Sequence, residues 1–356
     1  MILVLLGHLQ NDTIFSFSPY ILSLCSWIFS FHMALFFIIS GMLMAVKREN
    51  KGDFKTFIKK RFSQIMIPYF WFSLIYIFIV LYYLLINKSL PLKTLFVQVF
   101  YVIGMYGMNV LWFLPALFAA EVLFVLLAKH FKGIWSYISI LILILLACCA
   151  NELRSSLPNS PAIYERAGEL ITTILRPIFA CSYIFIGYCI YGAIEKIKSS
   201  VKKPTLYFTL SLPILLAVNI YINTLNRPVD FRSLVFNNYI FYYISSVCGS
   251  LFLILLTMIL SQVCPGKRSD KKDRFSLLTF YGINSLTFMA VHNNSAIMQL
   301  ALKSAMLLNR YLTRARGYIC YGVVILIYLI YVTLTILLIN RFFPFLTGRK
   351  SGKRAS

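Results

Sequence analysis

Ten apolar runs follow one another along the chain, separated by short polar stretches that carry most of the Lys and Arg residues. A helix that crosses a bilayer needs about 20 apolar residues. Nine of the runs come close to that length, and the first is too short. The pattern predicts an all-α fold, a polytopic transmembrane helical bundle of about ten spans with the first truncated. The predicted spans are 1–10, 24–46, 64–87, 110–128, 133–151, 176–194, 205–223, 237–263, 276–300 and 318–340.

The composition agrees with this pattern. Hydrophobic residues make up 60% of the 356 residues and charged residues 13%, whereas a soluble domain is about half apolar and about a quarter charged. The net charge of +23 would also suit nucleic acid. However, the bases lie between long runs rich in Phe and Tyr, so we expect membrane lipid and no nucleic acid as partner. The eight cysteines show no metal-binding spacing and are predicted to be small apolar packing residues.

The distribution of Lys and Arg predicts the orientation. The loops after the even-numbered spans, together with the C-terminal tail, hold 23 of the 34 bases, and the other loops hold 11. Because cytoplasmic loops are enriched in bases, both termini are predicted to be cytoplasmic, in a multi-pass protein of the cell membrane. We expect one membrane domain, 1–341, and a basic cytoplasmic tail, 342–356. Three arginines that break the rule are candidate contacts for an anionic partner: Arg310, Arg314 and Arg316.

Titratable side chains within the predicted spans are few, and they are functional candidates because they are costly at bilayer depth. His8, His32 and His292 come from three different spans at similar depth in the outer half, and Glu121 lies in the middle of another span. An imidazole takes and gives a proton near neutral pH, as acyl transfer to a hydroxyl requires. Two alternatives stay open, namely histidines bonded to helix carbonyls and a metal site. The second is disfavoured because neither a carboxylate nor a cysteine shares their spacing.

Three further features suggest contacts rather than proton transfer. Ser40 and Gly41 suit a small-residue helix contact, and Trp112 lies where an aromatic belt is expected. The stretch KRENKGDFKTFIKKRF at 47–62 is predicted to be an amphipathic helix on the inner leaflet. It could be held there by anionic lipid, or its bases, Lys59, Lys60 and Arg61 especially, could bind a phosphorylated cytoplasmic ligand.

Five stretches, taken in order, resemble the acyltransferase 3 family of integral membrane acyltransferases. The most similar members are those that O-acetylate sugars, the fucose 4-O-acetylase-like group. Each stretch alone is a weak signal, whereas the five in order are fairly specific and cover nearly the whole chain. They are ILVLLGH at 2–8, FHMALFFIISGML at 31–43, KKRFSQIMIPYF at 59–70, LWFLPALF at 111–118 and YGINSLTFMAVHN at 281–293.

The resemblance implies acetyl-CoA as a cytoplasmic donor substrate, no cofactor and no metal, and an envelope glycan or lipid-linked sugar as acceptor. It assigns the catalytic role to His8, acting either as general base or as a nucleophile that carries the acetyl group. Lys60 and Arg61 are the expected donor-binding residues, and Gln64 stands where the family has a further base. The candidate substrate-binding residues are His32, Ser40, Trp112, Glu121, Asn284, Ser285 and His292.

A polysaccharide or lipid-linked sugar exporter is the alternative function. An exporter of large sugars needs polar residues along several helices, whereas here they cluster at few positions.

The short first run raises a separate expectation. The seven residues before His8 rise only about 10 Å as a helix, whereas the hydrocarbon core is about 30 Å thick. We therefore expect the natural chain to begin about a dozen residues earlier, with an arginine about eleven positions before His8, as the family has.

Overall fold

The computed structural model describes residues 1–8, 19–47, 53–86, 91–157, 162–263, 277–293, 295–309 and 317–348. Within these ranges the regular structure is helical, apart from one isolated bridge between Asp230 and Val235. This confirms the all-α prediction. The α-helices are α1 (Ile2–Gly7), α2 (Pro19–Phe29), α3 (His32–Lys47), α4 (Phe54–Arg61), α5 (Ile67–Leu85), α6 (Leu92–Ile103), α7 (Phe113–His130), α8 (Ile134–Ser155), α9 (Ala162–Ser200), α10 (Pro204–Leu225), α11 (Tyr239–Val263), α12 (Leu277–Ile283), α13 (Ser285–Val291), α14 (Ser295–Asn309) and α15 (Gly317–Phe342).

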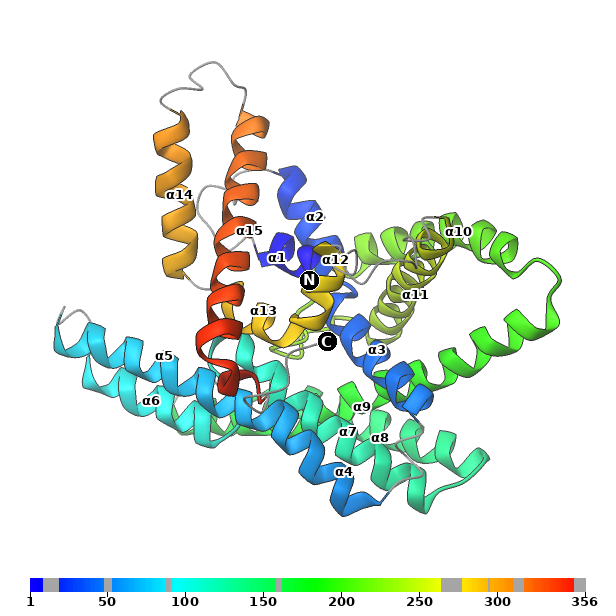
Figure 1. The fold of residues 1–356 in the computed structure, drawn as a ribbon. Coiled ribbons are helices and arrows are strands. Elements are labelled where there is room, and N and C mark those ends of the chain that lie inside the picture. Colours follow the sequence, from blue (N-terminus) through cyan, green and yellow to red (C-terminus); the bar gives the residue numbers. More distant parts are fainter. Residues whose placement is uncertain are drawn as a thin grey trace.

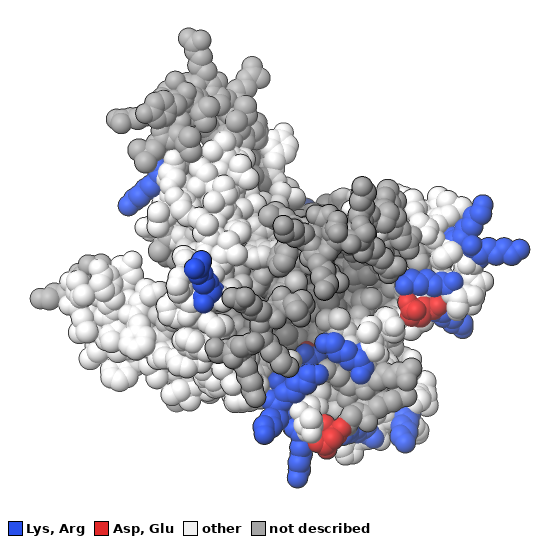
Figure 2. All heavy atoms as spheres, viewed as in Figure 1, with Lys and Arg blue, Asp and Glu red and all other residues white. Residues whose placement is uncertain are grey.

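Eight helical stretches of the described residues are long and apolar enough to cross a membrane, which confirms a multi-pass membrane protein. Helices α3, α7 and α9 meet at the centre, with α8 beside them (Figure 1). The α5–α6 pair extends to one side and the α14–α15 pair to another, while α10 and α11 pack together on a third. Basic side chains gather over α4 and over the turn between α9 and α10, whereas the surface of α5 and α6 in this view is almost free of charge (Figure 2).

A very close crossing of α3 and α9 holds the centre together. A Cβ added at Gly41 would lie 1.9 Å from the carbonyl oxygen of Ile184, and one added at Gly187 would lie 2.0 Å from that of Ile38. Small residues let two helix backbones approach within a membrane, where packing rather than the hydrophobic effect drives helix association. At the predicted small-residue contact, Gly41 therefore meets the backbone of Ile184 on α9, and Gly187 of α9 meets the backbone of Ile38 on α3.

The segment from α4 to α5 combines a helix cap with a change of helix type. The Asp53 carboxylate caps α4 by accepting hydrogen bonds from the Thr56 N–H and hydroxyl, at 2.8 and 2.7 Å. These bonds lower the pKa of Asp53. A π-helical turn, Phe62–Met66, then joins α4 to α5. Pro68 follows it and has no N–H to give to the carbonyl of Gln64, so a wider turn at this point is consistent with the proline.

Three features of the chain path differ from the predicted spans. The predicted span 276–300 is not one helix but α12, α13 and the beginning of α14, with a turn at Asn284. The span 24–46 is interrupted at Ser30–Phe31, so that His32 begins α3. Helix α6, Leu92–Ile103, was not predicted at all. Apolar runs report burial in a membrane, but a short break or a short packed helix leaves the run unchanged.

The beginning of the predicted tail packs against the bundle. A 3₁₀ turn, Pro344–Thr347, follows α15, with Leu346 buried and the Phe345 ring 5.1 Å from that of Trp71. Gly348, at φ +67°, approaches the carbonyl oxygen of Ser63 so closely that an added Cβ would lie 2.5 Å away. Residues 349–356 lie outside the described residues, and the division at residue 341 stays a prediction.

The α3–α9 crossing gives the first testable prediction. Gly187→Ala forces a methyl group onto the backbone of α3, and overpacking of this kind costs about 1–3 kcal/mol. We expect a lower thermal unfolding temperature of the purified protein in detergent. Gly192→Ala on the same helix is the matched control, because its Cβ meets no neighbouring atom within 4 Å. Equal unfolding temperatures for the two variants would contradict the close crossing.

Candidate functional site

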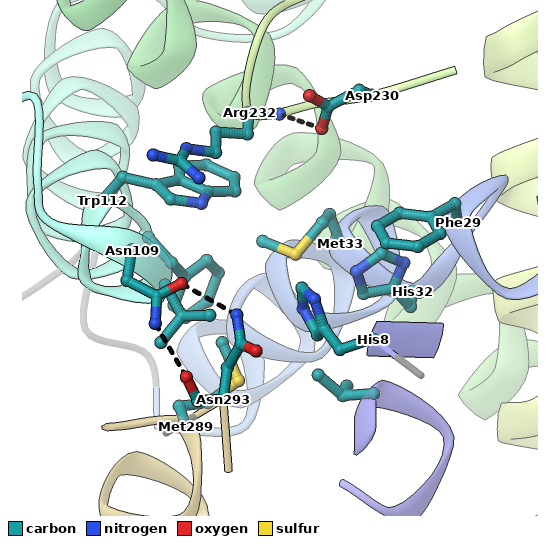
Figure 3. Close-up of a pocket in the computed structure, with 13 residues that line it drawn as sticks. His8, Phe29, His32, Met33, Asn109, Trp112, Asp230, Arg232, Met289 and Asn293 are labelled. Carbon is teal, nitrogen blue, oxygen red and sulfur yellow. Dashed lines mark hydrogen bonds between the residues drawn. The ribbon is translucent and has the colours of Figure 1, made fainter. Parts of the chain in front are cut away.

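A cavity of about 110 Å³ lies where α1, α3, the start of α7, α13 and the segment 226–238 meet (Figure 3). Short helices end at the cavity, namely α1 before His8, α2 at Phe29 and α13 before His292. The residues that line it are Val4, His8, Phe29, His32, Met33, Asn109, Val110, Trp112, Phe113, Asp230, Arg232, Met289 and Asn293.

The structure brings the three predicted histidines together at this cavity. The His8 ring, at the end of α1, lies with its centroid 5.1 Å from that of His292 and 5.7 Å from that of Phe29. The Phe29 ring lies in turn 4.9 Å from that of His32. His8 and His32 line the cavity, and His292 packs behind His8, with its own ring stacked on Phe288 at 5.6 Å.

Two of the imidazoles are fixed by their own helices. His32 Nδ1 lies 3.0 Å from the carbonyl oxygen of Ile28, and His292 Nδ1 lies 3.1 and 3.0 Å from those of Phe288 and Met289. Because a carbonyl only accepts, each Nδ1 carries the proton and each Nε2 presents a lone pair. His292 Nε2 is buried and has no hydrogen-bond partner among the described residues. Both rings therefore bond helix carbonyls, as the first alternative expected. His32 nevertheless lines the cavity, and His292 contacts His8, which lines it.

Sequence reasoning missed four polar residues of the cavity. Asn109 and Asn293 form a reciprocal pair, in which Asn109 Nδ2 donates to the Asn293 carbonyl at 2.9 Å and Asn293 Nδ2 donates to Asn109 Oδ1 at 2.8 Å (Figure 3). Asp230 accepts from the Arg232 N–H at 2.9 Å, and both side chains reach the cavity. Only Asn293, next to His292, carried a signal in the sequence.

Trp112 lies at the cavity but is 6% exposed. Its ring stacks with Phe231, with centroids 6.0 Å apart, and the Arg176 guanidinium carbon lies 5.0 Å from its centroid. It therefore forms part of the cavity wall rather than an open interface belt.

A second group of buried polar side chains, Ser40, Glu121 and Arg61, lies at a different depth in the bundle, which we call the Glu121 level. Glu121 Oε1 accepts a hydrogen bond from Ser40 Oγ at 2.5 Å, and Glu121 Oε2 lies 3.1 Å from Arg61 Nε. The Glu121 and Arg61 side chains are 2% and 13% exposed. His32 and Ser40 are eight residues apart on α3, so the two levels are about 12 Å apart along the helix. Two residues predicted for substrate and one predicted for donor thus form one network.

The remaining predicted residues lie outside these two groups. The Asn284 side chain donates to the Phe280 carbonyl at 2.9 Å and accepts from Asn340 Nδ2 at 2.8 Å. Ser285 begins α13, and Lys60 is exposed on α4. Their substrate and donor contacts stay predictions. Arg310, Arg314 and Arg316 lie outside the described residues. No three His, Cys, Asp or Glu side chains within the described ranges are placed to hold a metal ion.

The fold and the site define a multi-pass membrane protein with buried histidines around a polar cavity. The family model described as an acyltransferase domain, that of acyltransferase 3, matches residues 1–339. Because this match spans nearly the whole chain, the protein belongs to the acyltransferase 3 family and is an integral membrane acyltransferase. The family resemblance of the sequence is thereby confirmed. No curated protein and no solved structure matches the chain.

The buried pair of Arg61 and Glu121 gives an asymmetric prediction. Removing one partner of a buried ion pair costs about 3–5 kcal/mol because a charge is left behind. Arg61→Met leaves the carboxylate of the almost fully buried Glu121, whereas Glu121→Met leaves an arginine that is 13% exposed and closer to solvent. We expect Arg61→Met to destabilise more, and the double variant to recover part of the loss. A double-mutant cycle on thermal unfolding measures this, and strictly additive losses would refute the pairing.

Proposed function

We propose that the protein transfers an acetyl group from cytoplasmic acetyl-CoA to a hydroxyl of an envelope polysaccharide or glycolipid sugar. The observation that carries this proposal is His8, whose imidazole lies at a polar cavity between two imidazoles of fixed tautomer. A cavity with proton-accepting nitrogens and hydrogen-bonding side chains suits the activation of a hydroxyl group.

In the direct route His8 removes the proton of the sugar hydroxyl while the hydroxyl oxygen attacks the thioester carbonyl. The carbon–sulfur bond breaks, the thiolate of CoA leaves, and the proton held on His8 neutralises it. In the alternative route an imidazole nitrogen of His8 attacks the thioester, the carbon–sulfur bond breaks, and CoA leaves as the thiol with the proton of the other ring nitrogen. The sugar oxygen then takes the acetyl group from the nitrogen, and the hydroxyl proton returns to the imidazole. The direct route needs the acceptor and the thioester together at His8, whereas in the second route they can react there in turn.

The cavity offers the chemistry that an acceptor sugar needs. Asn109 and Asn293 present amides, Asp230 a carboxylate and Arg232 a guanidinium, and such groups can donate to and accept from sugar hydroxyls. Among the described residues, the buried His, Arg and Glu side chains lie at the cavity, beside it or at the level of Glu121 rather than along whole helices, an arrangement that favours transfer over export.

The basic residues at the end of α4, on the side of the bundle away from the histidine cavity, suit the binding of acetyl-CoA. Lys59, Lys60 and Arg61 lie in the last turn of α4, within a basic surface that favours the phosphates of CoA (Figure 2). This basic surface also supports a cytoplasmic location for α4. A mainly apolar hollow of about 330 Å³ runs along α3 from Phe31 to Ile39 and shares His32 and Val4 with the histidine cavity. This hollow offers room for the thioester-bearing chain of acetyl-CoA between the basic end of α4 and the histidine cavity.

His8→Ala should abolish acetylation, because a general acid–base group contributes about 10²–10⁴-fold and a lost nucleophile costs at least as much. The measurement is the acetyl content of envelope glycans by mass spectrometry, in a deletion strain that expresses the variant at normal level. His130→Ala is the matched control, since this exposed histidine bonds Leu126 O at 2.9 Å on the far part of α7. Full acetylation with well-expressed His8→Ala would remove His8 from the mechanism.

Lys60→Gln should raise the KM for acetyl-CoA several-fold and leave kcat nearly unchanged, because the lysine would bind the phosphates without taking part in the chemistry. The test is acetyl transfer in membranes over a range of donor concentrations. Lys203→Gln serves as control, because Lys203 is an exposed lysine in the separate basic group at the turn between α9 and α10. Unchanged donor kinetics in Lys60→Gln would leave the segment as a lipid anchor.

A further inference from the structure

Arg176 of α9 is a buried arginine that the proposed chemistry does not use. It is 1% exposed and is the largest of the fully buried side chains among the described residues. Its Nε donates to the carbonyl of Arg232 at 2.7 Å and its Nη1 to that of Tyr106 at 2.9 Å. Its guanidinium carbon also lies 4.5 Å from the Tyr106 ring centroid and 5.0 Å from that of Trp112. One guanidinium therefore contacts two separate segments of chain.

Those two segments build one side of the histidine cavity. The first, from Gly104 to Trp112, supplies Asn109, Val110 and Trp112. The second, 226–238, supplies Asp230 and Arg232, and Figure 3 shows Arg232 above Trp112 with Asp230 beside it, across the cavity from His8. Arg176 lies behind this wall and joins its two halves.

The second segment is held through its backbone. Three consecutive carbonyls, those of Arg232, Ser233 and Leu234, accept from Arg176 Nε at 2.7 Å, from Arg154 Nη2 at 3.1 Å and from Asn151 Nδ2 at 2.9 Å. The reciprocal backbone bonds of Asp230 and Val235, at 2.8 and 2.9 Å, close the turn. Arg154 and Asn151 belong to α8, whereas Arg176 also bonds Tyr106 and stacks on Trp112. It therefore joins the turn to the segment 104–112, beside the stacking of Phe231 on Trp112.

The residue type supports this role. A buried cation is costly, and its cost falls as its donors are satisfied. Arg176 Nε and Nη1 donate to carbonyls, and its buried Nη2 has no hydrogen-bond partner among the described residues. A guanidinium can donate along two directions and stack on two aromatic rings at once, which an ammonium group cannot reproduce. We propose that Arg176 is a positioning residue, which holds Asp230, Arg232 and Trp112 in the geometry with which the cavity binds the acceptor. This inference rests on the proposed function.

The test is Arg176→Lys, with two comparison variants. Arg166→Lys is the control on the same helix, because Arg166 bonds Glu169 at 2.5 Å and the Tyr101 hydroxyl at 2.8 Å and touches neither segment of the wall. Arg154→Lys loosens the same turn but leaves Trp112 and Tyr106 untouched. Each purified variant is examined by hydrogen–deuterium exchange and by acetyl transfer from acetyl-CoA to envelope glycan extracted from a deletion strain.

We expect faster amide exchange in 229–236 for Arg176→Lys and Arg154→Lys, and faster exchange around 104–112 only for Arg176→Lys. The KM for the glycan should rise about tenfold in Arg176→Lys, as the loss of a charged hydrogen bond implies. The KM for acetyl-CoA and kcat should stay within about twofold. Arg166→Lys should change none of these quantities.

Unchanged exchange in both segments would overturn the proposal, as would equal losses in donor and acceptor kinetics. If the unaltered protein transfers no acetyl group to any glycan while Arg176→Lys still loosens both segments, then the proposed function fails and the structural role of Arg176 stands. In that outcome the assignment to acceptor binding is also refuted.

Discussion

The backbone contact between α3 and α9 is the constraint on which the rest of the structure depends. At Gly41 and Gly187 the two helices are so close that no Cβ fits between them. Because α3 carries both His32 and Ser40, and α9 carries Arg176, one interface sets the relative heights of His32, of the Ser40–Glu121 contact and of the arginine behind the cavity wall. A shift of one helix turn, about 5.4 Å, would separate these groups from their partners on α7 and on the segment 226–238.

Burying polar side chains costs free energy of desolvation, and hydrogen bonds to nearby groups offset part of this cost. Several of these side chains are satisfied by the backbone or by partners at the same depth, such as His32 by Ile28 and Glu121 by Ser40 and Arg61. His292 Nε2 and Arg176 Nη2 have no hydrogen-bond partner among the described residues. Between the levels, α3 presents mainly apolar residues such as Phe37 and Ile38, both fully buried. The separation of about 12 Å along α3 weakens the interaction between the Glu121–Arg61 pair and the histidines, because Coulomb energy falls with distance.

The sequence predicts the helices well because a helix that crosses a membrane requires a long apolar run. It also predicts that His8, His32 and His292 share a depth, since depth follows from position along a span. It does not predict the breaks at Ser30–Phe31 and Asn284, which leave the apolar runs intact. Nor does it predict contacts across the chain. Glu121 and Arg61 are both visible as candidates, but their pairing depends on how α4 lies against α7. Asn109, Asp230 and Arg232 stand in or beside loops, where polar residues are expected and carry no signal. Arg176 is the first residue of the predicted span 176–194, where a base is expected at a span end, but it lies inside α9.

The fixed tautomers of the two neighbouring histidines bear on the choice between the two chemical routes. His32 and His292 have each committed an Nδ1 proton to a carbonyl, so in the neutral form each can only accept at Nε2. Such lone pairs stabilise a cation beside them. The ring of His292 lies 5.1 Å from that of His8, and its buried Nε2 has no hydrogen-bond partner within the described part of the chain. In the proposed direct route, His8 becomes an imidazolium when it takes the hydroxyl proton, and the Nε2 acceptor of His292 is nearby. An imidazole nucleophile gains less, because its acetylated form, once neutral, carries no charge and no N–H for these neighbours to stabilise. The arrangement therefore favours the general-base route.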